Sequence, residues 1–461
     1  MKDVTGRMSR RRLKGDFRMQ RRCATVLAML TVGFGGPASA AAPAHTAGLE
    51  SADAATLGFS PQRLAKLDAA MKRQVDDGKF AGITTLVLRH GKIVDFQAVG
   101  QQDLATHAPM RKDSIYRIMS MTKPIVGVAL MILYEEGRWQ MDDPVSKFLP
   151  ELKNLKVLNA SGQLEAAQHE MTMRELLTNT SGIAGPSVPV PGATRNPAVG
   201  KLYDAADLRG GTLADMVPRF AKLPLGFQPG TEFEYAMSQD IQGAVIERIS
   251  GQTLDKFLEE RILKPLGMVD TGFGVPTAKR DRLAAVYDYD GAGKLRPSPY
   301  QTKDQVVGQT PKFLSGSGGL YSTAPDYARF ATMLASGGRL GGVRILSPAT
   351  LKLMTSDLLP PGVKLHFIEK LDGMGYGVNL GIIEDAGRAS YNAGAFGEGT
   401  YFWTGVLGSW WWNDPVNDVT VIGMVQQEFA AFAHFGVPTA APNLRAMSAS
   451  LVYGALTDPS R

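Results

Sequence analysis

The sequence predicts an α/β (α+β) protein in which strands from both ends of the chain form one sheet, with a helical lobe inserted between them. Strand-like runs occur near the amino end, at 83–100, and return after residue 300. The stretch from about 137 to 300 carries helical patterns separated by long loops that contain glycine and proline. Strands of one sheet must be adjacent in space, so the two chain ends come together. The cleft between the two lobes is the expected place for chemistry.

The charge of the chain is unevenly distributed. The 461 residues are 44% hydrophobic and 20% charged, which is typical of a folded globular protein. The formal net charge is +6, but residues 1–22 alone hold nine basic and two acidic side chains. The rest of the chain is therefore close to neutral, and the basic balance does not indicate nucleic-acid binding.

Residues 1–40 have the pattern of a signal peptide. A basic region precedes an apolar run from Cys23 to Phe34, and small residues ending at Ala40 follow. This run is shorter than the ~20 residues that a membrane-spanning helix needs. We expect export to the periplasm or the medium, with no stable membrane span after cleavage. Cys23 is the single cysteine, so no disulfide, cysteine nucleophile or cysteine metal site is expected beyond the leader.

The first elements after the leader are a helix and a hairpin. Ser60 can cap a helix and Pro61 suits its first turn, and apolar residues follow at helical spacing. The runs 83–88 and 93–96, joined by a turn at 90–91, predict two antiparallel strands.

Helices, loops and further strands follow. Apolar residues dominate 121–136, which predicts a helix buried on most sides. Residues 183–202 contain four prolines and are expected to form an extended surface loop. Three strand-like runs and a closing helix complete the chain: 375–380, 402–412, 419–425 and 443–456. The expected lobes are a sheet lobe of residues 41–115 and 300–461 and a helical lobe of residues 116–299.

Ser120 and Lys123 form the first chemically informative pair. They lie three positions apart at the start of the helix predicted over 121–136, so their side chains share one face. A serine hydroxyl needs a base at neutral pH, and a lysine can serve if burial lowers its pKa. The apolar residues that follow Lys123 supply such a setting. Taken alone, the four-residue pattern also fits a capping serine and a surface lysine.

Two further elements accompany this pair. Tyr235 ends a turn just before a helix, where its hydroxyl can point into a cleft. Beside Lys123 its pKa would fall, and it could relay protons to and from a leaving group; a core tyrosine is the alternative. From 402 to 412 aromatic and small residues alternate as on a strand, and Gly405 and Gly408 permit close approach to its backbone. An aromatic core strand would show the same alternation.

Together these elements resemble the serine β-lactamase and penicillin-binding-protein superfamily. The closest similarity is to its esterase branch, the family VIII carboxylesterases, which are similar to class C β-lactamases. The resemblance also covers supporting segments at 134–137, 142–145, 149–150, 172–182, 265–268 and 317–323. It implies a β-lactamase-like fold, an antiparallel sheet flanked by helices plus an inserted all-helical lobe, with Ser120 at the lobe interface.

The resemblance also implies roles for single residues. Ser120 would be the acylated nucleophile, with Lys123 and Tyr235 as the proton-transfer pair. The backbone N–H groups of Ser120 and Val406 would form the oxyanion hole. The substrate-binding positions would be Met237, Trp403, Thr404 and Gly405. No metal and no cofactor is implied.

Two positions depart from the lactamase pattern. Met237 stands where β-lactamases and D,D-peptidases have asparagine or serine, and Trp403 stands where their Lys-Thr-Gly motif has its lysine. No cation is left there to pair with a substrate carboxylate, and an aromatic wall favours an apolar acyl or alcohol group. We therefore expect a serine hydrolase that cleaves small carboxylic esters through an acyl-enzyme, with weak or no action on β-lactams.

Three other functions use the same scaffold. A β-lactamase or D,D-peptidase would recognise penicillins, an acyltransferase would pass the acyl group to an alcohol or amine, and a silent binding protein would do neither. Other hydrolase types lack support, because the sequence has no G-x-S-x-G elbow and its six histidines are scattered. Glu398 and Asp414, which lie close in sequence to the run 402–412, are assigned solvated or structural roles. The expected partner is a small-molecule ester.

Overall fold

The structure is a computed structural model. It describes residues 49–185, 196–299, 307–365, 371–389, 396–430 and 439–457. All described residues belong to one compact unit. The predicted leader, residues 1–40, lies outside the described residues. In the described part of the chain, none of the helices is long and apolar enough to cross a membrane.

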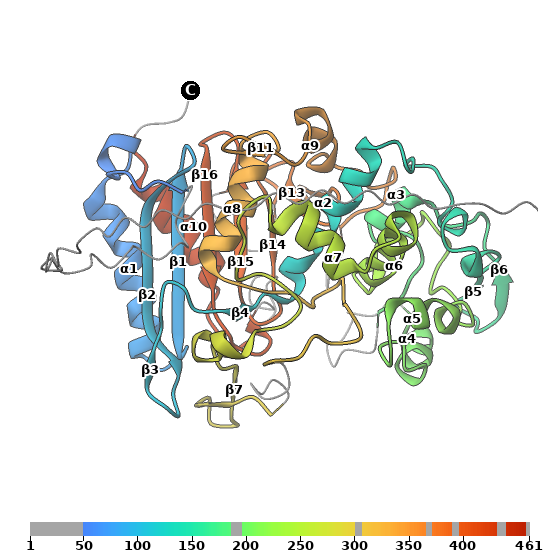
Figure 1. Ribbon diagram of the computed structural model, residues 1–461, viewed down its shortest axis with the longest axis horizontal. Helices are drawn as coiled ribbons and strands as arrows, with labels where there is room; N and C mark the ends of the chain where they lie inside the picture. Colours follow the sequence, from blue (N-terminus) through green and yellow to red (C-terminus); the bar gives the residue numbers. More distant parts are fainter. Residues whose placement is uncertain are drawn as a thin grey trace, which may run out of the picture. The chain divides into compact units, whose positions relative to one another are not determined.

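The strands of both chain ends meet in one sheet, as the sequence predicts. In the described residues, eight strands pair in the order β12-β13-β14-β15-β16-β1-β2-β3, each neighbouring pair antiparallel (Figure 1). The junction of the two ends is the β1–β16 pair, where Val87 lies opposite Val421. The strand bounds are β1 Gly82–Arg89, β2 Lys92–Asp103, β3 Ala108–Pro109, β12 Met374–Tyr376, β13 Gly381–Ile383, β14 Tyr401–Thr404, β15 Trp410–Asp414 and β16 Val419–Met424.

Helices cover this sheet and build the insert. All residues of β1, β15 and β16 are buried, so the centre of the sheet is covered on both faces. Helices α1 and α10 pack together with α1 against β1 and β2, while α8 packs against β1, β15 and β16. The helix bounds are α1 Pro61–Asp76, α2 Thr122–Glu135, α3 Met173–Leu177, α4 Pro197–Ala205, α5 Leu213–Phe220, α6 Ser238–Ser250, α7 Leu254–Leu258, α8 Ala324–Ala335, α9 Pro348–Met354 and α10 Leu444–Ala455.

Local signals at the chain ends are confirmed. The Ser60 side chain accepts a hydrogen bond from the Arg63 amide and caps α1. The hairpin of β1 and β2 turns at His90 and Gly91, both with positive φ, which matches the right-handed twist of the strands. Asn443 caps α10 in the same way as Ser60 caps α1.

Two expected strands are instead hairpins. The run 402–412 was expected to be one strand, but it divides into β14 and β15. The Gly405 amide donates to the Ser409 carbonyl, and Gly408 has a φ of 92°, so a tight turn separates the strands. The run 375–380 likewise ends its strand at Tyr376, because Asn379 turns with a φ of 60° before β13 begins. Periodicity cannot locate such turns when both flanks are apolar.

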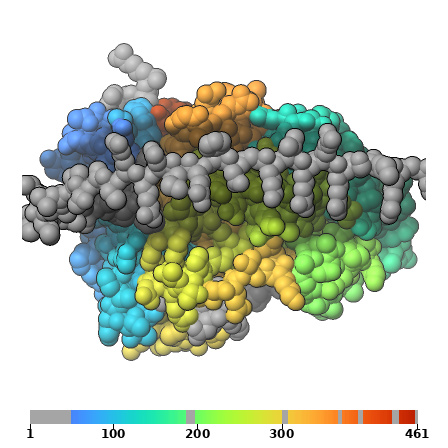
Figure 2. Space-filling model, in the orientation of Figure 1, coloured from blue at the N-terminus to red at the C-terminus, as the bar shows by residue number. Residues whose placement is uncertain are grey.

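The insert also differs from the expected all-helical lobe. Two short hairpins interrupt its helices: β5 Lys156–Leu158 with β6 Leu164–Ala166, and β7 Tyr287–Tyr289 with β8 Leu295–Pro297. The expected loop 183–202 contains the start of α4, capped by Asn196; residues 186–195 lie outside the described part. The face shown in Figure 2 exposes much of this insert, coloured green to yellow.

Smaller pairs complete the described strands. One pair links β4 Tyr116–Arg117, just before Ser120, to β9 Tyr321–Ser322. Another joins β10 Arg339–Leu340 to β11 Val343–Arg344. The β4–β9 pair holds the segment that leads into Ser120 against residues that follow the insert in the sequence.

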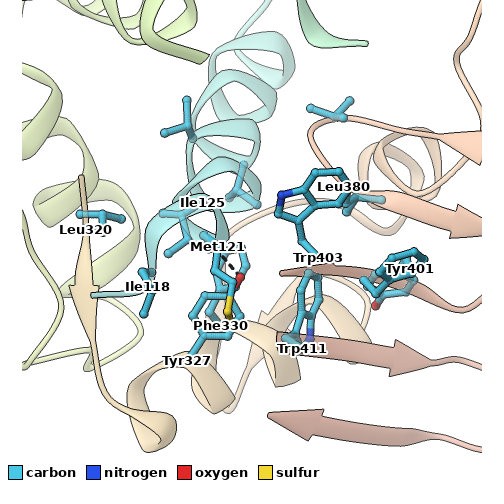
Figure 3. Packing of buried hydrophobic residues seen from close by; sticks show 14 of the residues in the cluster. Ile118, Met121, Ile125, Leu320, Tyr327, Phe330, Leu380, Tyr401, Trp403 and Trp411 are labelled. Carbon is cyan, nitrogen blue, oxygen red and sulfur yellow. Dashed lines mark hydrogen bonds between the residues drawn. The ribbon is translucent and has the colours of Figure 1, made fainter. Parts of the chain in front are cut away.

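Helix α2 is buried on nearly all sides, as its composition predicts. Twelve of its fourteen residues are buried, from Thr122 to Leu133. Figure 3 shows Met121, at the start of this helix, packed against Tyr327 and Phe330 of α8, with Trp411 of β15 beside them. The Tyr327 hydroxyl donates a hydrogen bond to the Met121 carbonyl at 3.1 Å. Side chains of three elements thus fix the amino end of α2.

A pair of carboxyl groups joins α1 to the sheet. The carboxyl groups of Asp68 on α1 and Asp95 on β2 lie close enough to affect each other's ionisation. Burial and the neighbouring carboxyl raise the pKa of Asp95 to about 7, while Lys112 acts in the opposite direction. Two close carboxylates cannot both ionise cheaply, so the pair holds a proton that the unfolded chain releases near pH 4.

Asp95→Asn is expected to stabilise the protein at alkaline pH. A carboxyl whose pKa is raised by folding contributes stability at low pH, and this contribution is lost as pH rises through about 7. The amide removes that loss, so the free energy of unfolding at pH 8 should increase by roughly 1–2 kcal/mol. Thermal unfolding from pH 5 to 8 measures it. Asp76→Asn, on the exposed face of α1, is the control and should give no such pH-dependent gain.

Candidate active site

The segment before α2 presents Ser120 at a strained turn. The Ile118 amide donates a hydrogen bond to the Leu320 carbonyl. Met119 then adopts a φ of 48°, a backbone conformation that residues with a Cβ rarely adopt. A short 3₁₀ turn, Met119–Met121, follows and runs into α2. Ser120 is left partly exposed, while Lys123 is only 2% exposed. The fold therefore buries the amine and leaves the hydroxyl accessible.

The predicted contact between Ser120 and Lys123 is present. Lys123 Nζ donates to Ser120 Oγ at 3.1 Å and to the Ser317 carbonyl oxygen at 2.6 Å. The second bond fixes the direction in which the amine points. Helical spacing alone places the two side chains on one face, and the carbonyl from a distant loop brings them into contact.

Burial lowers the pKa of the Lys123 ammonium group, as a base that acts at neutral pH requires. Removal from water lowers the pKa of its ammonium group to about 7. The charge of Arg209 also lowers this pKa, whereas the charge of Asp240 raises it. A large fraction of the amine is therefore neutral near pH 7 and can accept a proton from the serine.

Tyr235 lies beside this pair, as the sequence predicts. Lys123 Nζ is 4.6 Å from the centre of its ring, and its hydroxyl accepts a hydrogen bond from Trp403 Nε1 at 3.4 Å. The expectation of a lowered pKa is wrong, because burial raises the pKa of the phenol, although hydrogen bonds with Ser120 and Trp403 oppose the rise. The lysine amine lies against the phenol ring. Tyr235 therefore stays protonated and is suited to donating a proton.

Trp403 supports Tyr235 from behind. Its side chain is 1% exposed, and its ring lies 5.4 Å from those of both Tyr235 and Tyr376. The indole is covered and hydrogen bonds to the phenol, while its predicted place in a pocket wall stays a prediction. Met237 and Thr404 are also buried, each 4% exposed. Trp403, Met237 and Thr404 therefore lie below the accessible surface of the site.

The turn after β14 lies directly against the nucleophile segment. A Cβ at Gly405 would lie 2.5 Å from the Ile118 carbonyl oxygen and 3.5 Å from the Met119 Cβ, so glycine is required for this approach. Val406 follows, and it is partly exposed like Ser120. The two positions predicted to donate backbone N–H groups to an oxyanion thus lie on touching segments.

Gly405→Ala is expected to lower kcat for ester hydrolysis by about 10- to 100-fold. The added methyl group must push the turn away from Ile118, which moves Val406 and weakens one oxyanion donor. Ester turnover and thermal unfolding of the same preparations measure the effect. Gly397→Ala is the matched control, because the nearest atom to its Cβ is 4.0 Å away. Equal activity of the two variants would contradict the predicted oxyanion turn.

Sequence reasoning missed the residues that hold the amine. The Ser317 carbonyl binds Lys123, and the buried Asp240 carboxylate holds the amide of Ser317. Asn379 donates from its side chain to the Lys123 carbonyl at 3.1 Å. A backbone carbonyl leaves no mark in a sequence. Asp240 does leave one, since an acid in the first turn of a helix beside Tyr235 is visible, but its contact lies 77 residues away.

Comparison with known proteins matches residues 67–441 to the family described as Beta-lactamase. Protein Rv1367c of Mycobacterium tuberculosis is 34% identical over 370 residues, 78% of this chain and 88% of that protein. Esterase EstB of Burkholderia gladioli is 30% identical over 384 residues, 78% of this chain and 89% of that protein. The structure of EstCE1, a hydrolase with promiscuous acyltransferase activity, has a TM-score of 0.68 at 25% identity and covers 86% of this chain and 99% of its own. With the family match spanning most of its length, this chain belongs to the β-lactamase family.

Proposed function

We propose that this protein is a serine hydrolase that cleaves small carboxylic esters through an acyl-enzyme on Ser120. The observation that carries the proposal is the 3.1 Å contact between Ser120 Oγ and a buried Lys123 amine whose pKa is near 7. A nucleophile and a base in hydrogen-bonding range are the minimum for covalent catalysis. The similarity to an esterase, at 30% identity, supports the same reaction class.

The proposed reaction has two halves. Ser120 Oγ bonds to the ester carbonyl carbon while neutral Lys123 takes its proton, and the tetrahedral oxyanion is stabilised by the backbone N–H groups of Ser120 and Val406. The C–O bond to the alcohol then breaks, and Tyr235 donates the proton that the alkoxide needs. Lys123 returns a proton to Tyr235. Water then attacks the acyl-enzyme by the reverse route and releases the acid.

The proposed substrates are esters without a recognition carboxylate. Trp403 and Met237 occupy positions where penicillin-recognising relatives carry a cation and an amide or hydroxyl. Both side chains are buried, and the indole N–H of Trp403 donates to the Tyr235 hydroxyl. An unpaired carboxylate beside them would be poorly solvated, which disfavours β-lactams and acidic peptides. The leader pattern of residues 1–40 supports export, so we propose action outside the cytoplasm.

Acyl transfer is the second candidate. EstCE1, 25% identical, is a hydrolase with promiscuous acyltransferase activity, so the same acyl-enzyme here could pass its acyl group to an alcohol. Hydrolysis and transfer share every residue named above. A competing alcohol in the assay separates them, because transfer yields a second ester and hydrolysis yields acid alone.

Mass spectrometry after a fluorophosphonate probe, together with an ester panel graded by acyl length, tests the proposal. We expect the probe mass on the peptide that contains Ser120, turnover that varies with acyl length, and slow or no turnover of cephalosporins. Ser120→Ala is the control and should take up no label. Label on another residue would overturn the nucleophile assignment. Faster turnover of cephalosporins than of short p-nitrophenyl esters would overturn the substrate assignment.

A further inference from the structure

Asp240 is a buried carboxylate close to the proposed site. It lies in the first turn of α6, and its side chain has no exposed area. Burying an ionised carboxylate is costly unless it is paired and hydrogen bonded. Its Oδ1 accepts from Ser315 Oγ at 2.8 Å and from the Ser317 amide at 2.9 Å. Both donors belong to one turn of the chain.

That turn carries the acceptor of the Lys123 amine. The Ser317 carbonyl oxygen lies 2.6 Å from Lys123 Nζ, so the amide of Ser317 faces Asp240 and its carbonyl faces the lysine. Gly316 brings the same turn against α6, where a Cβ would lie 2.2 Å from the Gln239 carbonyl oxygen. The position of the amine therefore depends on how firmly α6 holds the turn.

The second oxygen of Asp240 is also buried. Among the described residues, Asp240 Oδ2 has no hydrogen-bond donor within range. Arg209 Nη2 is 4.0 Å away, and the arginine side chain is 64% exposed. The exposed Arg209 side chain thus lies near the buried Asp240 carboxylate. This carboxylate holds the Ser315–Ser317 turn, whose carbonyl oxygen binds the Lys123 amine.

We propose that Asp240 is a positioning residue for the Lys123 amine, acting through the Ser315–Ser317 turn, and that Arg209 balances its charge. This inference rests on the proposed function, since it concerns the base of that reaction. The groups that face Lys123 are the Ser120 hydroxyl, the Tyr235 ring, the Ser317 carbonyl and these two charges. The anion favours the charged amine and the distant cation disfavours it, so the pair sets how readily the amine releases its proton.

The charges predict shifts of opposite sign in the pH profile. Asp240→Asn keeps the shape but removes the anion, so the acidic limb of kcat/KM should move to lower pH. It also loosens the turn, and kcat at pH 8 should fall about tenfold. Arg209→Gln removes the cation, so the acidic limb should move to higher pH. Arg209→Lys should restore the original profile.

Ser315→Ala is the matched control. It removes one of the two donors to Asp240 and leaves both charges in place, so kcat should fall modestly without a shift of the acidic limb. The Arg209 variants change an exposed side chain, so they still test the effect of charge on the pH profile if Asp240→Asn folds poorly. All variants are measured with one ester substrate and with the fluorophosphonate probe, alongside the unmodified protein.

The outcomes separate the two claims. Opposite shifts for Asp240→Asn and Arg209→Gln support the inference, because a merely structural role changes the active fraction and not the profile. Shifts of the same sign, or unchanged profiles in an active enzyme, would overturn it. If the unmodified protein neither hydrolyses esters nor labels at Ser120, the proposed function has failed instead.

Discussion

Lys123→Met is expected to lower kcat/KM for ester hydrolysis by about 10⁴-fold and, at the same time, to raise the unfolding temperature. The activity falls because the serine loses the base that lies 3.1 Å from its oxygen. The stability rises because the folded protein no longer buries an amine that the unfolded chain would charge. In the unmodified protein, kcat/KM should rise as pH passes through about 7, the pKa of the amine.

The sign of the stability change follows from the lowered pKa. Between about 7 and the ordinary value of 10.5, the unfolded chain binds a proton that the folded protein does not, so stability rises with pH over that window. The gain from methionine is therefore full below pH 7 and disappears near 10.5. The Ser317 carbonyl loses its donor in the variant, which leaves a net gain of about 1–2 kcal/mol at pH 7.

Lys123→Arg is the matched control for this prediction. Arginine stays charged at every relevant pH and cannot serve as a base, so the activity loss should be equal. The buried charge remains, however, and the unfolding temperature should fall. Calorimetry of the two variants at pH 6 and pH 9 gives the comparison. Destabilisation by methionine at pH 6 would show that the amine is not buried in its charged form at a cost.

Much of this site follows from local sequence rules. The spacing of Ser120 and Lys123 places them on one helical face, and the apolar run of α2 predicts the burial that lowers the pKa of the lysine. The meeting of the two chain ends in one sheet follows from where the strand-like runs lie. Such features depend on neighbours within a few positions, so the sequence alone predicts them.

Other parts depend on contacts between distant segments. The glycines of the run 402–412 predict a close approach to its backbone, but nothing in that run shows that Ile118 is the residue that approaches Gly405. Burial raises the pKa of the Tyr235 phenol, and the lysine approaches its ring from a direction that spacing does not give. Trp403 is covered because Tyr235 and Tyr376 close over it. These features arise only when the chain has folded.

The position of the amine shows the same division. Helix α2 places the backbone of Lys123, and Asn379 donates a hydrogen bond to the Lys123 carbonyl. The amine at the end of the side chain is held by the Ser317 carbonyl. Asn379 in turn accepts from Gln239 and Gln242 of α6 at 2.9 and 3.1 Å. A network of buried amides therefore connects the base to the helix that follows Tyr235. In the sequence alone, nothing distinguishes the residues of this network from other polar residues.

Tyr235→Phe is the second variant with a large expected effect, and its size should depend on the leaving group. The phenylalanine ring keeps the contacts with Lys123 and Trp403, so only the hydroxyl is lost. An alkyl alcohol leaves as a strong base and needs a proton, whereas p-nitrophenolate leaves without one. We expect kcat to fall about 10³-fold for alkyl esters and about tenfold for p-nitrophenyl esters.

Tyr376→Phe is the control for this variant, because it removes a neighbouring buried hydroxyl whose partner is Asn179. Its effect should be small and the same for both kinds of ester. A steady-state series of esters that share one acyl group and differ in the alcohol measures the dependence. Equal losses across the series for Tyr235→Phe would contradict proton donation to the leaving group, since a hydroxyl that only orients Ser120 would affect all alcohols alike. A loss that grows with the basicity of the alcohol would identify the phenol as the acid, in keeping with a pKa that burial raises.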